Sequence, residues 1–469
     1  MAILAMGWLT VSCVKDNIED TPGTEDPIEN PNEDPGEEPG EEPGENPGEN
    51  PQTPADPGSD VPTLPRWTKP ASFPVIRITT DGGKSIKDKV TKVPGTIRFE
   101  DPSKMYSDTT ELEERMWIRG RGNTSWDNPK KGYRIKMDKK HHVFGMRSDK
   151  DWTLLAEYSD NTLLRNTVSM QISRLCGMPW TPDNVFAEVY LNGTYIGLYT
   201  LFEHKETGVH KVDVEPSDVA GGDFYVELDN KDGDGDVYFR TTTFYKKIKF
   251  KDPENPGTAQ KNYIEKFFND CEKVLLADNF SETDGYPSML DVPSFINNYI
   301  VQELTKNPDG NMRLSTYFCK KKDGKLMMPH VWDFDLALGN CTYFTSDWEN
   351  NYGLPIDNGP TGWFVLYFGG FPCGYGGQYE YPNKQDGWYQ HLFNDPVFVK
   401  AVQDRWEQVY PRLQTIPAYI DALAAANADA YSRNYNKWWR GGGSSSDINS
   451  LKNFFTTRLD WMNTEIRKL

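Results

Sequence analysis

Short runs of alternating apolar and polar residues fill the first half of the folded sequence. Such runs, separated by Gly, Asn and Asp, predict β-strands joined by turns. They are FPVIRITT (73–80), GTIRFED (95–101), RMWIRGRG (115–122), YRIKM (133–137), FAEVYLNGTYIGLYTLFE (186–203) and DFYVEL (223–228). The pair Asn192-Gly193 divides the fifth run into two strands, because this dipeptide is the strongest short hairpin signal.

Helical spacing of apolar residues is rare in the first half and common in the second. One helix is predicted over 161–176, with Gly177 as its stop. After Pro256 the same spacing predicts helices over 262–277, 293–305, 397–413, 418–434 and 448–468. Two strands, 315–321 and 326–334, interrupt them across a Lys-Asp-Gly turn. The chain is therefore predicted to be α+β, with a β-rich part over 67–255 and a helical part over 256–469.

Charge is distributed very unevenly along the 469 residues, whose net charge is −19. Residues 1–65 hold 16 acidic side chains and one basic side chain, so the remaining chain is nearly neutral. The predicted folded part shows no cluster of Lys and Arg of the kind that binds phosphate backbones. This pattern excludes nucleic acid as an expected partner.

The N-terminus predicts an exported, lipid-anchored protein. Residues 1–13, MAILAMGWLTVSC, are too short to span a bilayer and resemble the apolar part of a secretory signal. The Leu-Thr-Val-Ser-Cys sequence ending at Cys13 resembles a bacterial lipobox, which predicts lipidation of Cys13 over an ordinary secretory signal or a leftover apolar terminus. Residues 14–20 resemble the acidic surface-export tag of Bacteroidetes lipoproteins, which points to the outer surface of the cell envelope.

Residues 14–66 are predicted to be a disordered acidic tether. Within them, 21–65 repeats a Glu-Pro-Gly theme and holds 12 of the 33 prolines and no aromatic residue. Proline removes backbone donors and the carboxylates repel one another, so the segment cannot bury a core. Beyond Cys13 the chain has five cysteines, which cannot all pair and are expected to be mostly buried free thiols: Cys176, Cys271, Cys319, Cys341 and Cys373.

The segment 302–340 carries the acids with the clearest chemical meaning. Asp309 lies in Asn-Pro-Asp-Gly after a predicted helix, and Asp333 and Asp335 end a predicted strand. Phosphoryl transfer needs one carboxylate to orient the attacking hydroxyl and another to hold the magnesium that bridges the phosphates. The alternative is a plain tight turn at Asp309, with the other two acids capping a helix that begins near Leu336.

A glycine-containing loop precedes these acids in the β-rich part. Arg119 and Asn123 flank Gly-Arg-Gly, whose middle residue is Arg121, and Lys131 and Lys136 follow before and within the next predicted strand. Backbone amides of such a loop can approach phosphates, and a lysine on the next strand can reach the α- and β-phosphates. The alternative is a β-hairpin whose Lys and Arg side chains extend into solvent.

These segments together resemble the CotH family, named for a spore-coat protein. The resemblance runs from about residue 73 to 469 and rests on RGRGNTSW, KKGYRIKM, DKDWTLLAEYSDNTLLRN, VYLNGTYIGLYTLFEHKE, GDFYVELD, KNPDG and WDFDLALGN. It implies a fold like that of protein kinases and transfer of phosphate from ATP to protein Ser side chains with a divalent metal, Mg²⁺ or Mn²⁺. On this resemblance Asp309 matches the catalytic-loop Asp and Asp333 the metal-binding Asp.

The sequence departs from ordinary protein kinases at several positions. The loop lacks His-Arg-Asp and a downstream Asn, which leaves Ser315 or Asn311 as a second metal ligand. Lys131 and Lys136 both remain candidates for the nucleotide lysine, with Lys136 preferred.

The predicted helix over 161–176 contains no Glu to pair with that lysine. The carboxylate partner is therefore left open among Glu157, Glu188 and Glu203.

Two further stretches could each have either a ligand-binding role or a purely structural role. The acidic loop 229–236 does not fit a calcium-binding EF-hand and is expected to be a solvated hairpin. The aromatic-rich stretch 363–389 would suit a glycan or peptide cleft, or simply a large core.

The expected function is an exported protein kinase, with a non-catalytic binding module as the alternative. A hydrolase built on Asp333 and Asp335 is disfavoured, because acids two residues apart on a strand lack the separation that glycosidases need.

Overall fold

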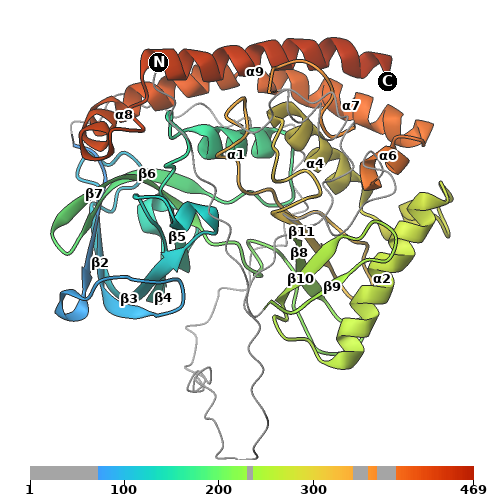
Figure 1. Cartoon of the computed structure of the whole chain (residues 1–469), viewed down its shortest axis with the longest axis horizontal. Coiled ribbons are helices and arrows are strands. Elements are labelled where there is room, and N and C mark those ends of the chain that lie inside the picture. The colour runs from blue at the N-terminus through green and yellow to red at the C-terminus, as the bar shows by residue number, and fades with distance from the viewer. Residues whose placement is uncertain (1–71, 230–235, 342–357, 367–386) are drawn as a thin grey trace, which may run out of the picture. The chain divides into compact units, whose positions relative to one another are not determined.

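The computed structural model describes residues 72–229, 236–341, 358–366 and 387–469. The predicted signal at 1–13 with Cys13, the predicted tether at 14–66, most of the acidic loop and most of the aromatic-rich stretch with Cys373 lie outside these residues. Within them, the first half is rich in strands and the second half in helices, as predicted (Figure 1).

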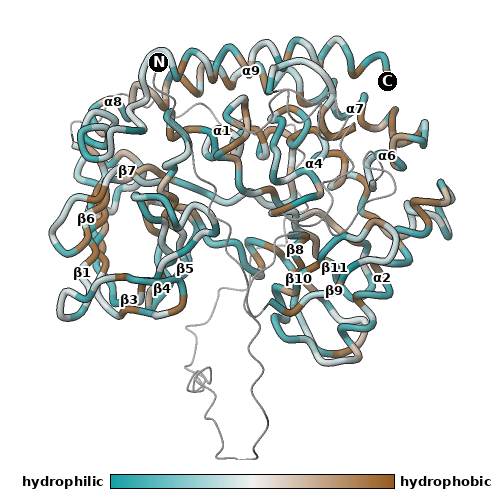
Figure 2. The backbone as a smooth tube through the Cα atoms, in the orientation of Figure 1, coloured by the Kyte–Doolittle hydropathy of each residue, from teal (hydrophilic) through white to brown (hydrophobic). Residues whose placement is uncertain are grey.

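Seven strands close into a barrel in the order β1-β2-β3-β4-β5-β7-β6 (Figure 1). They are β1 (Val75–Thr80), β2 (Val93–Glu100), β3 (Glu111–Arg121), β4 (Gly132–His141), β5 (Asp149–Leu155), β6 (Asn184–Leu191) and β7 (Thr194–Glu203). Strands β1 and β6 pair in parallel and close the barrel, and the other neighbours pair antiparallel. Alternate residues, among them Ile76, Ile97 and Ile135, are buried in the barrel core. Figure 2 shows hydrophobic positions in brown along the barrel strands.

The hairpin predicted at Asn192-Gly193 is confirmed. Both residues have left-handed backbones, with φ 49° and 77°, as a two-residue type I′ turn requires. Leu191 pairs with Thr194 across the turn.

A separate four-stranded sheet follows in the order β11-β8-β10-β9. Its strands are β8 (Phe224–Leu228), β9 (Tyr238–Arg240), β10 (Lys247–Asp252) and β11 (Thr316–Lys320). Helix α2 (Thr258–Leu276) covers one face of this sheet through Phe268, whose ring centroid lies 5.5 Å from Phe318 and 5.8 Å from Phe239.

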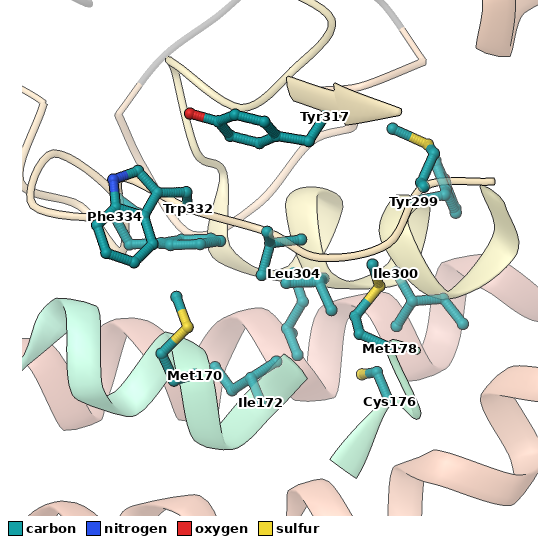
Figure 3. Packing of buried hydrophobic residues seen from close by; sticks show 14 of the residues in the cluster. Met170, Ile172, Cys176, Met178, Tyr299, Ile300, Leu304, Tyr317, Trp332 and Phe334 are labelled. Carbon is teal, nitrogen blue, oxygen red and sulfur yellow. The ribbon is translucent and has the colours of Figure 1, made fainter. Parts of the chain in front are cut away.

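The remaining helices surround a buried central helix, α4 (Val292–Thr305). They are α1 (Arg165–Leu175), α3 (Tyr286–Met289), α6 (Trp388–Leu392), α7 (Pro396–Leu413), α8 (Ile416–Trp438) and α9 (Ser445–Glu465). Figure 3 shows Ile300 and Leu304 of α4 among the side chains of α1. On α4, Glu303 is fully buried, pairs with Arg458 of α9, and accepts the N–H groups of Phe364 (2.7 Å) and Val365 (2.8 Å).

The strand predicted over 326–334 is wrong. Only two isolated bridges form there. Leu326 pairs with Leu290, and Met327 exchanges two 2.9 Å backbone hydrogen bonds with Cys319 of β11. The ladder cannot continue because Pro329 has no N–H. The helix near Leu336, which belonged to the alternative interpretation of Asp333 and Asp335 as helix caps, is also not formed, since residues 335–340 are turns.

Other predicted boundaries shift by a few residues. The helix predicted from 161 begins at Arg165, because residues 161–164 form a turn in which Leu163 has a φ of 56°. The pattern also missed strands β5, β9 and β10.

The four cysteines within the described residues are free and buried, as predicted. Among the helices that the structure describes, none has a stretch both long and apolar enough to cross a bilayer.

Candidate functional site

The acids singled out in the sequence converge in the structure. Asp309 lies in the loop that follows α4, and Asp333 and Asp335 lie in the segment that follows β11. The Ser315 hydroxyl donates a hydrogen bond of 3.2 Å to Asp333 Oδ2. The charges of Asp333 and Asp309 both act on the Asp335 carboxyl, so the two separate motifs meet at one place.

Glu157, from the turn between β5 and α1, completes this group. We call Asp309, Asp333, Asp335 and Glu157 the acid cluster. Loss of solvent raises the pKa of Asp335 well above its usual range, and the negative charges of Asp333, Glu157 and Asp309 raise it further. Burial likewise raises the pKa of Glu157 to about 8. Near neutral pH these two carboxyls therefore hold their protons, and binding of a cation would favour their ionised forms.

Asn166 on α1 fixes two parts of the acid cluster relative to each other. Its Nδ2 donates to Glu157 Oε2 at 2.8 Å, and its Oδ1 accepts the Phe334 backbone N–H at 2.8 Å. Phe334 is fully buried, and Figure 3 places it with Trp332 above α1 near Met170. Since Phe334 anchors the middle of Asp-Phe-Asp in the core, the acids on either side of it are held at the site.

Asp160 caps the start of α1 and ties it to the same segment. Its carboxylate accepts the N–H groups of Thr162 (2.9 Å), Leu164 (3.0 Å) and Arg165 (2.9 Å), and it pairs with the Arg165 guanidinium. Arg165 Nε also donates to the Ala337 carbonyl at 3.1 Å. The turn before α1 and the segment after Asp335 are thus one connected unit.

Three site residues have left-handed backbones that glycine would adopt more easily. The φ angles are 52° at Glu157, 69° at Asp333 and 45° at Ser315. Each such residue costs of order 1 kcal/mol, and strained residues of this kind cluster at functional sites. The strain supports a functional role for this group of residues.

Two cations from the barrel face the acid cluster. Arg121 ends β3, and burial lowers its pKa while Asp333 acts in the opposite direction. Lys205 follows β7, and burial lowers its pKa to about 8 against the effect of Glu227. Both lie over the Trp332 ring, with Arg121 Cζ 5.9 Å and Lys205 Nζ 5.6 Å from its centroid.

Lys205 is held in place from the four-stranded sheet. Its ammonium donates to the Tyr317 hydroxyl and lies 3.7 Å from Glu227. Burial alone would raise the pKa of Glu227, but Lys205, Lys251 and the Tyr317 hydroxyl outweigh it and lower that pKa to about 2. Glu227 therefore stays ionised and keeps Lys205 between barrel and sheet.

The lysines favoured by the sequence lie elsewhere. Lys136 is on the outer face of β4, because Ile135 and Met137 beside it fill the barrel. Lys131 donates to the Trp126 carbonyl and lies 5.1 Å from the Trp126 ring. Neither lysine is among the charges that act most strongly on the pKa of Asp335, Arg121 or Lys205.

The other predicted phosphate-binding groups have local partners or face solvent. Arg119 donates to the Lys89 carbonyl, and Asn123 is exposed. Packing explains the glycine of this loop as well, since a Cβ on Gly120 would lie 2.3 Å from the Trp126 ring. Of the Gly-loop residues, only Arg121 has an electrostatic effect at the acid cluster.

The structure separates the three candidate glutamates. Glu188 pairs with Arg433 at 2.6 Å, and Glu203 pairs with Arg147. Only Glu157 belongs to the acid cluster.

The residues at the site fit a hard divalent metal that arrives with phosphates. Within the described residues, no group of three or more His, Cys, Asp or Glu side chains already has the spacing of a metal site. The candidate donors Asp333, Asp335 and Ser315 supply only oxygen, which Mg²⁺ and Mn²⁺ prefer. Mg²⁺ commonly takes one or two protein carboxylates and completes its shell with phosphate oxygens and water.

Asp309 occupies a turn that its neighbours stabilise. Its N–H donates to Asn307 Oδ1 at 3.2 Å, and its carboxylate pairs with Arg313 at 3.2 Å. Asn311, the alternative metal ligand, is buried in the same loop. The tight turn that the sequence allowed is present, and it carries the Asp309 carboxylate to the acid cluster.

Comparison with known proteins gives one family. The family model described as CotH kinase protein matches residues 118–462, a span that contains the whole acid cluster, Arg121 and Lys205. No curated protein matches the chain.

His330 next to the site gives a pH-dependent test of the packing. Its ring stacks on Tyr317 (4.5 Å), Nε2 accepts from the Tyr225 hydroxyl at 2.8 Å, and Nδ1 lies 3.3 Å from the Val331 carbonyl. Burial lowers its pKa to about 3, and Lys205 lowers it further while Glu227 acts in the opposite direction. The folded protein therefore keeps this histidine neutral where the unfolded chain protonates it.

Because the folded pKa lies below the unfolded one, His330 makes stability fall as pH decreases below about 6.5. At pH 5 its contribution is a loss of about 2 kcal/mol relative to pH 7. Urea unfolding of wild type and His330→Gln at both pH values measures this as a smaller pH dependence in the variant. The exposed His210→Gln is the control, and equal pH dependence in wild type and His330→Gln would contradict the assignment.

Proposed function

We propose, from the premise that this chain belongs to the CotH kinase family, that it transfers the γ-phosphate of ATP to a Ser or Thr hydroxyl of a protein. The observation that supports this most is the convergence of the acid cluster with Arg121 and Lys205. Carboxylates that orient a hydroxyl and bind a metal, opposed by cations that bind phosphates, are the parts that phosphoryl transfer needs. The proposal includes an atypical version of the protein-kinase fold.

Each residue has a separate role in this proposal. Asp309 orients the acceptor hydroxyl and accepts its proton. Asp333, with Asp335 and Ser315, would hold Mg²⁺ or Mn²⁺, which would bridge the phosphates and reduce their negative charge. Arg121 and Lys205 bind phosphate oxygens, where charge-assisted hydrogen bonds are strongest.

The transfer step itself needs little covalent work from the protein. The acceptor oxygen forms a bond to the γ-phosphorus while the bond from that phosphorus to the β–γ bridging oxygen breaks. ADP leaves with the electron pair of the broken bond, and the hydroxyl proton passes to the Asp309 carboxylate. Glu157, linked through Asn166 to the backbone at Phe334, keeps the acids in place during this step.

One observation favours a second candidate, a non-catalytic module that binds a protein or glycan. The Asp309 carboxylate pairs with Arg313 at 3.2 Å, and a carboxylate engaged in this way is a weaker proton acceptor. A catalytic Asp309 requires this ion pair to open or to rotate when the acceptor binds.

Substitution of the two central acids separates binding from transfer. Asp333→Ala is expected to abolish the rise in melting temperature that Mn-ATP or Mg-ATP gives, because the metal-bound phosphates lose their main ligand. Asp309→Ala is expected to keep that shift and to lower phosphate transfer from γ-labelled ATP to casein by about 10²–10⁴-fold. Asp323→Asn, in the exposed turn after β11, is the control. A wild-type protein without any nucleotide response would favour the non-catalytic module.

The choice of lysine is tested by a matched pair of substitutions. Lys205→Met is expected to raise the KM for ATP by about 10- to 100-fold, since a charge-assisted hydrogen bond contributes about 1.5–3 kcal/mol. Lys136→Met is expected to change the KM by less than about twofold, because its side chain is on the outer face of β4. Steady-state kinetics measures both KM values. A larger effect for Lys136→Met than for Lys205→Met would identify Lys136 of β4 as the lysine that binds the nucleotide.

We also propose that the protein is exported and anchored in the bacterial envelope through a lipid on Cys13, with residues 14–66 as a tether to the outer surface. The support is the lipobox-like sequence and the acidic, proline-rich composition that follows it. Cys13→Ser is expected to move the protein from the membrane fraction to the soluble fraction of the cells that express it. Equal membrane association of both forms would exclude lipidation as the anchor.

A further inference from the structure

A concave site lies where α8 ends and α9 begins, and Asn161 from the turn before α1 forms part of its lining. This pocket has a volume of about 340 Å³, and its lining includes Asn161, Tyr435, Trp439, Arg440, Ser444 and Asp447. We call it the α8–α9 pocket; Figure 1 shows the two helices that it joins. Its volume is within the range of small-ligand sites.

The most unusual residue of the pocket is Trp439. Its side chain is 78% exposed and its backbone is left-handed, with φ 57° and ψ 23°. A left-handed conformation is unfavourable for a bulky residue, and helices usually end with Gly or Asn at such a position. Packing within the chain does not offset this cost, so an external ligand is the simplest reason for an indole here.

A second aromatic ring extends the exposed surface. Tyr435 is 46% exposed, and its ring centroid lies 6.3 Å from that of Trp439. Single exposed aromatic residues are ordinary, but two adjacent ones beside a pocket form an apolar surface, whose rings here are tilted 57° to each other.

The floor of the pocket is rigid before any ligand arrives. Gly443 donates its N–H to the Asn161 carbonyl at 3.1 Å, and buried Asn434 donates to the carbonyls of Arg440 and Gly441, both at 3.0 Å. Gly443 has a φ of 52°, and a Cβ there would lie 2.5 Å from the Tyr431 ring. Since this turn is fixed by hydrogen bonds and close packing, binding would cost little ordering of the backbone.

The polar groups of the lining exclude an anion. The N-terminus of α9 is already capped, because Ser444 Oγ accepts the Asp447 N–H at 3.1 Å and donates to the Asp447 carboxylate at 2.6 Å. That carboxylate in the lining repels phosphate or sulfate. The guanidinium of Arg440 lies over the Tyr158 ring, 5.1 Å from its centroid. The remaining possibility is a neutral ligand with many hydroxyl groups and one apolar face.

We propose that the α8–α9 pocket binds a neutral saccharide. The C–H face of a pyranose ring would pack on Trp439 and Tyr435, which offer large apolar areas at fixed positions. Its hydroxyls would bond the amide of Asn161, the guanidinium of Arg440 and the carboxylate of Asp447, which together supply donors and acceptors. This binding site does not depend on the phosphotransferase proposal.

Isothermal titration of the full chain tests the site with four probes: lactose, maltotriose, cellotriose and N,N′-diacetylchitobiose. At least one probe is expected to bind with a Kd in about the millimolar range. Trp439→Ala is expected to weaken that binding by at least about tenfold, and Trp439→Phe by less than about threefold. Tyr245→Ala is the control and should leave the Kd unchanged, because Tyr245 is as exposed as Tyr435 but lies in the loop between β9 and β10.

A stability measurement separates ligand binding from a structural role of the tryptophan. Trp439→Gly removes the backbone strain, so its melting temperature should equal or exceed that of wild type while saccharide binding is lost. A large drop in melting temperature would assign the indole to packing and overturn the proposal. So would the absence of binding by all four probes, or binding of inorganic phosphate that Arg440→Ala removes.

Discussion

The mutual repulsion of buried carboxylates is the constraint on which the rest of this site depends. Asp335 loses solvent and at the same time faces Asp333, Glu157 and Asp309, which raises its pKa well above the usual range. Such groups stay close only where the surrounding structure fixes them more strongly than they repel. Here the acids are held in place by backbone amides, by the Asn166 side chain and by the aromatic core that packs around Phe334. All of these groups are uncharged or belong to neutral pairs.

The start of α1 is where these fixing interactions meet. Asp160 caps the helix and pairs with Arg165, and Arg165 reaches the carbonyl of Ala337 behind Asp335. The next residue, Asn166, binds both Glu157 and the backbone of Phe334. A short helix therefore joins the barrel to the segment that follows β11. This explains how acids more than 150 residues apart in sequence can hold a fixed geometry.

The sequence singles out three of the four clustered acids and Arg121, but it gives no sign of Lys205, for a physical reason. Asp309, Ser315 and Asp333 lie within one segment whose turn and strand signals are local, and the structure brings Ser315 and Asp333 into contact. Lys205 becomes a site residue only because β7 ends beside the four-stranded sheet, where Tyr317 and Glu227 hold it. That proximity depends on barrel order and on packing between two sheets, which no local pattern encodes. The strand wrongly predicted over 326–334 could have been rejected from the sequence, because Pro329 has no N–H to donate to a β-ladder.

The balance of charge also bears on the order in which ligands can bind. ATP is a polyanion, and the acid cluster repels it, while Arg121 and Lys205 offset only part of that repulsion and Lys205 is already engaged by Glu227. Without a divalent cation, the raised pKa values of Asp335 and Glu157 keep these two carboxyls protonated, so the cation is needed to bring them into their ionised forms. Metal and nucleotide are then expected to bind together, each reducing the repulsion that opposes the other.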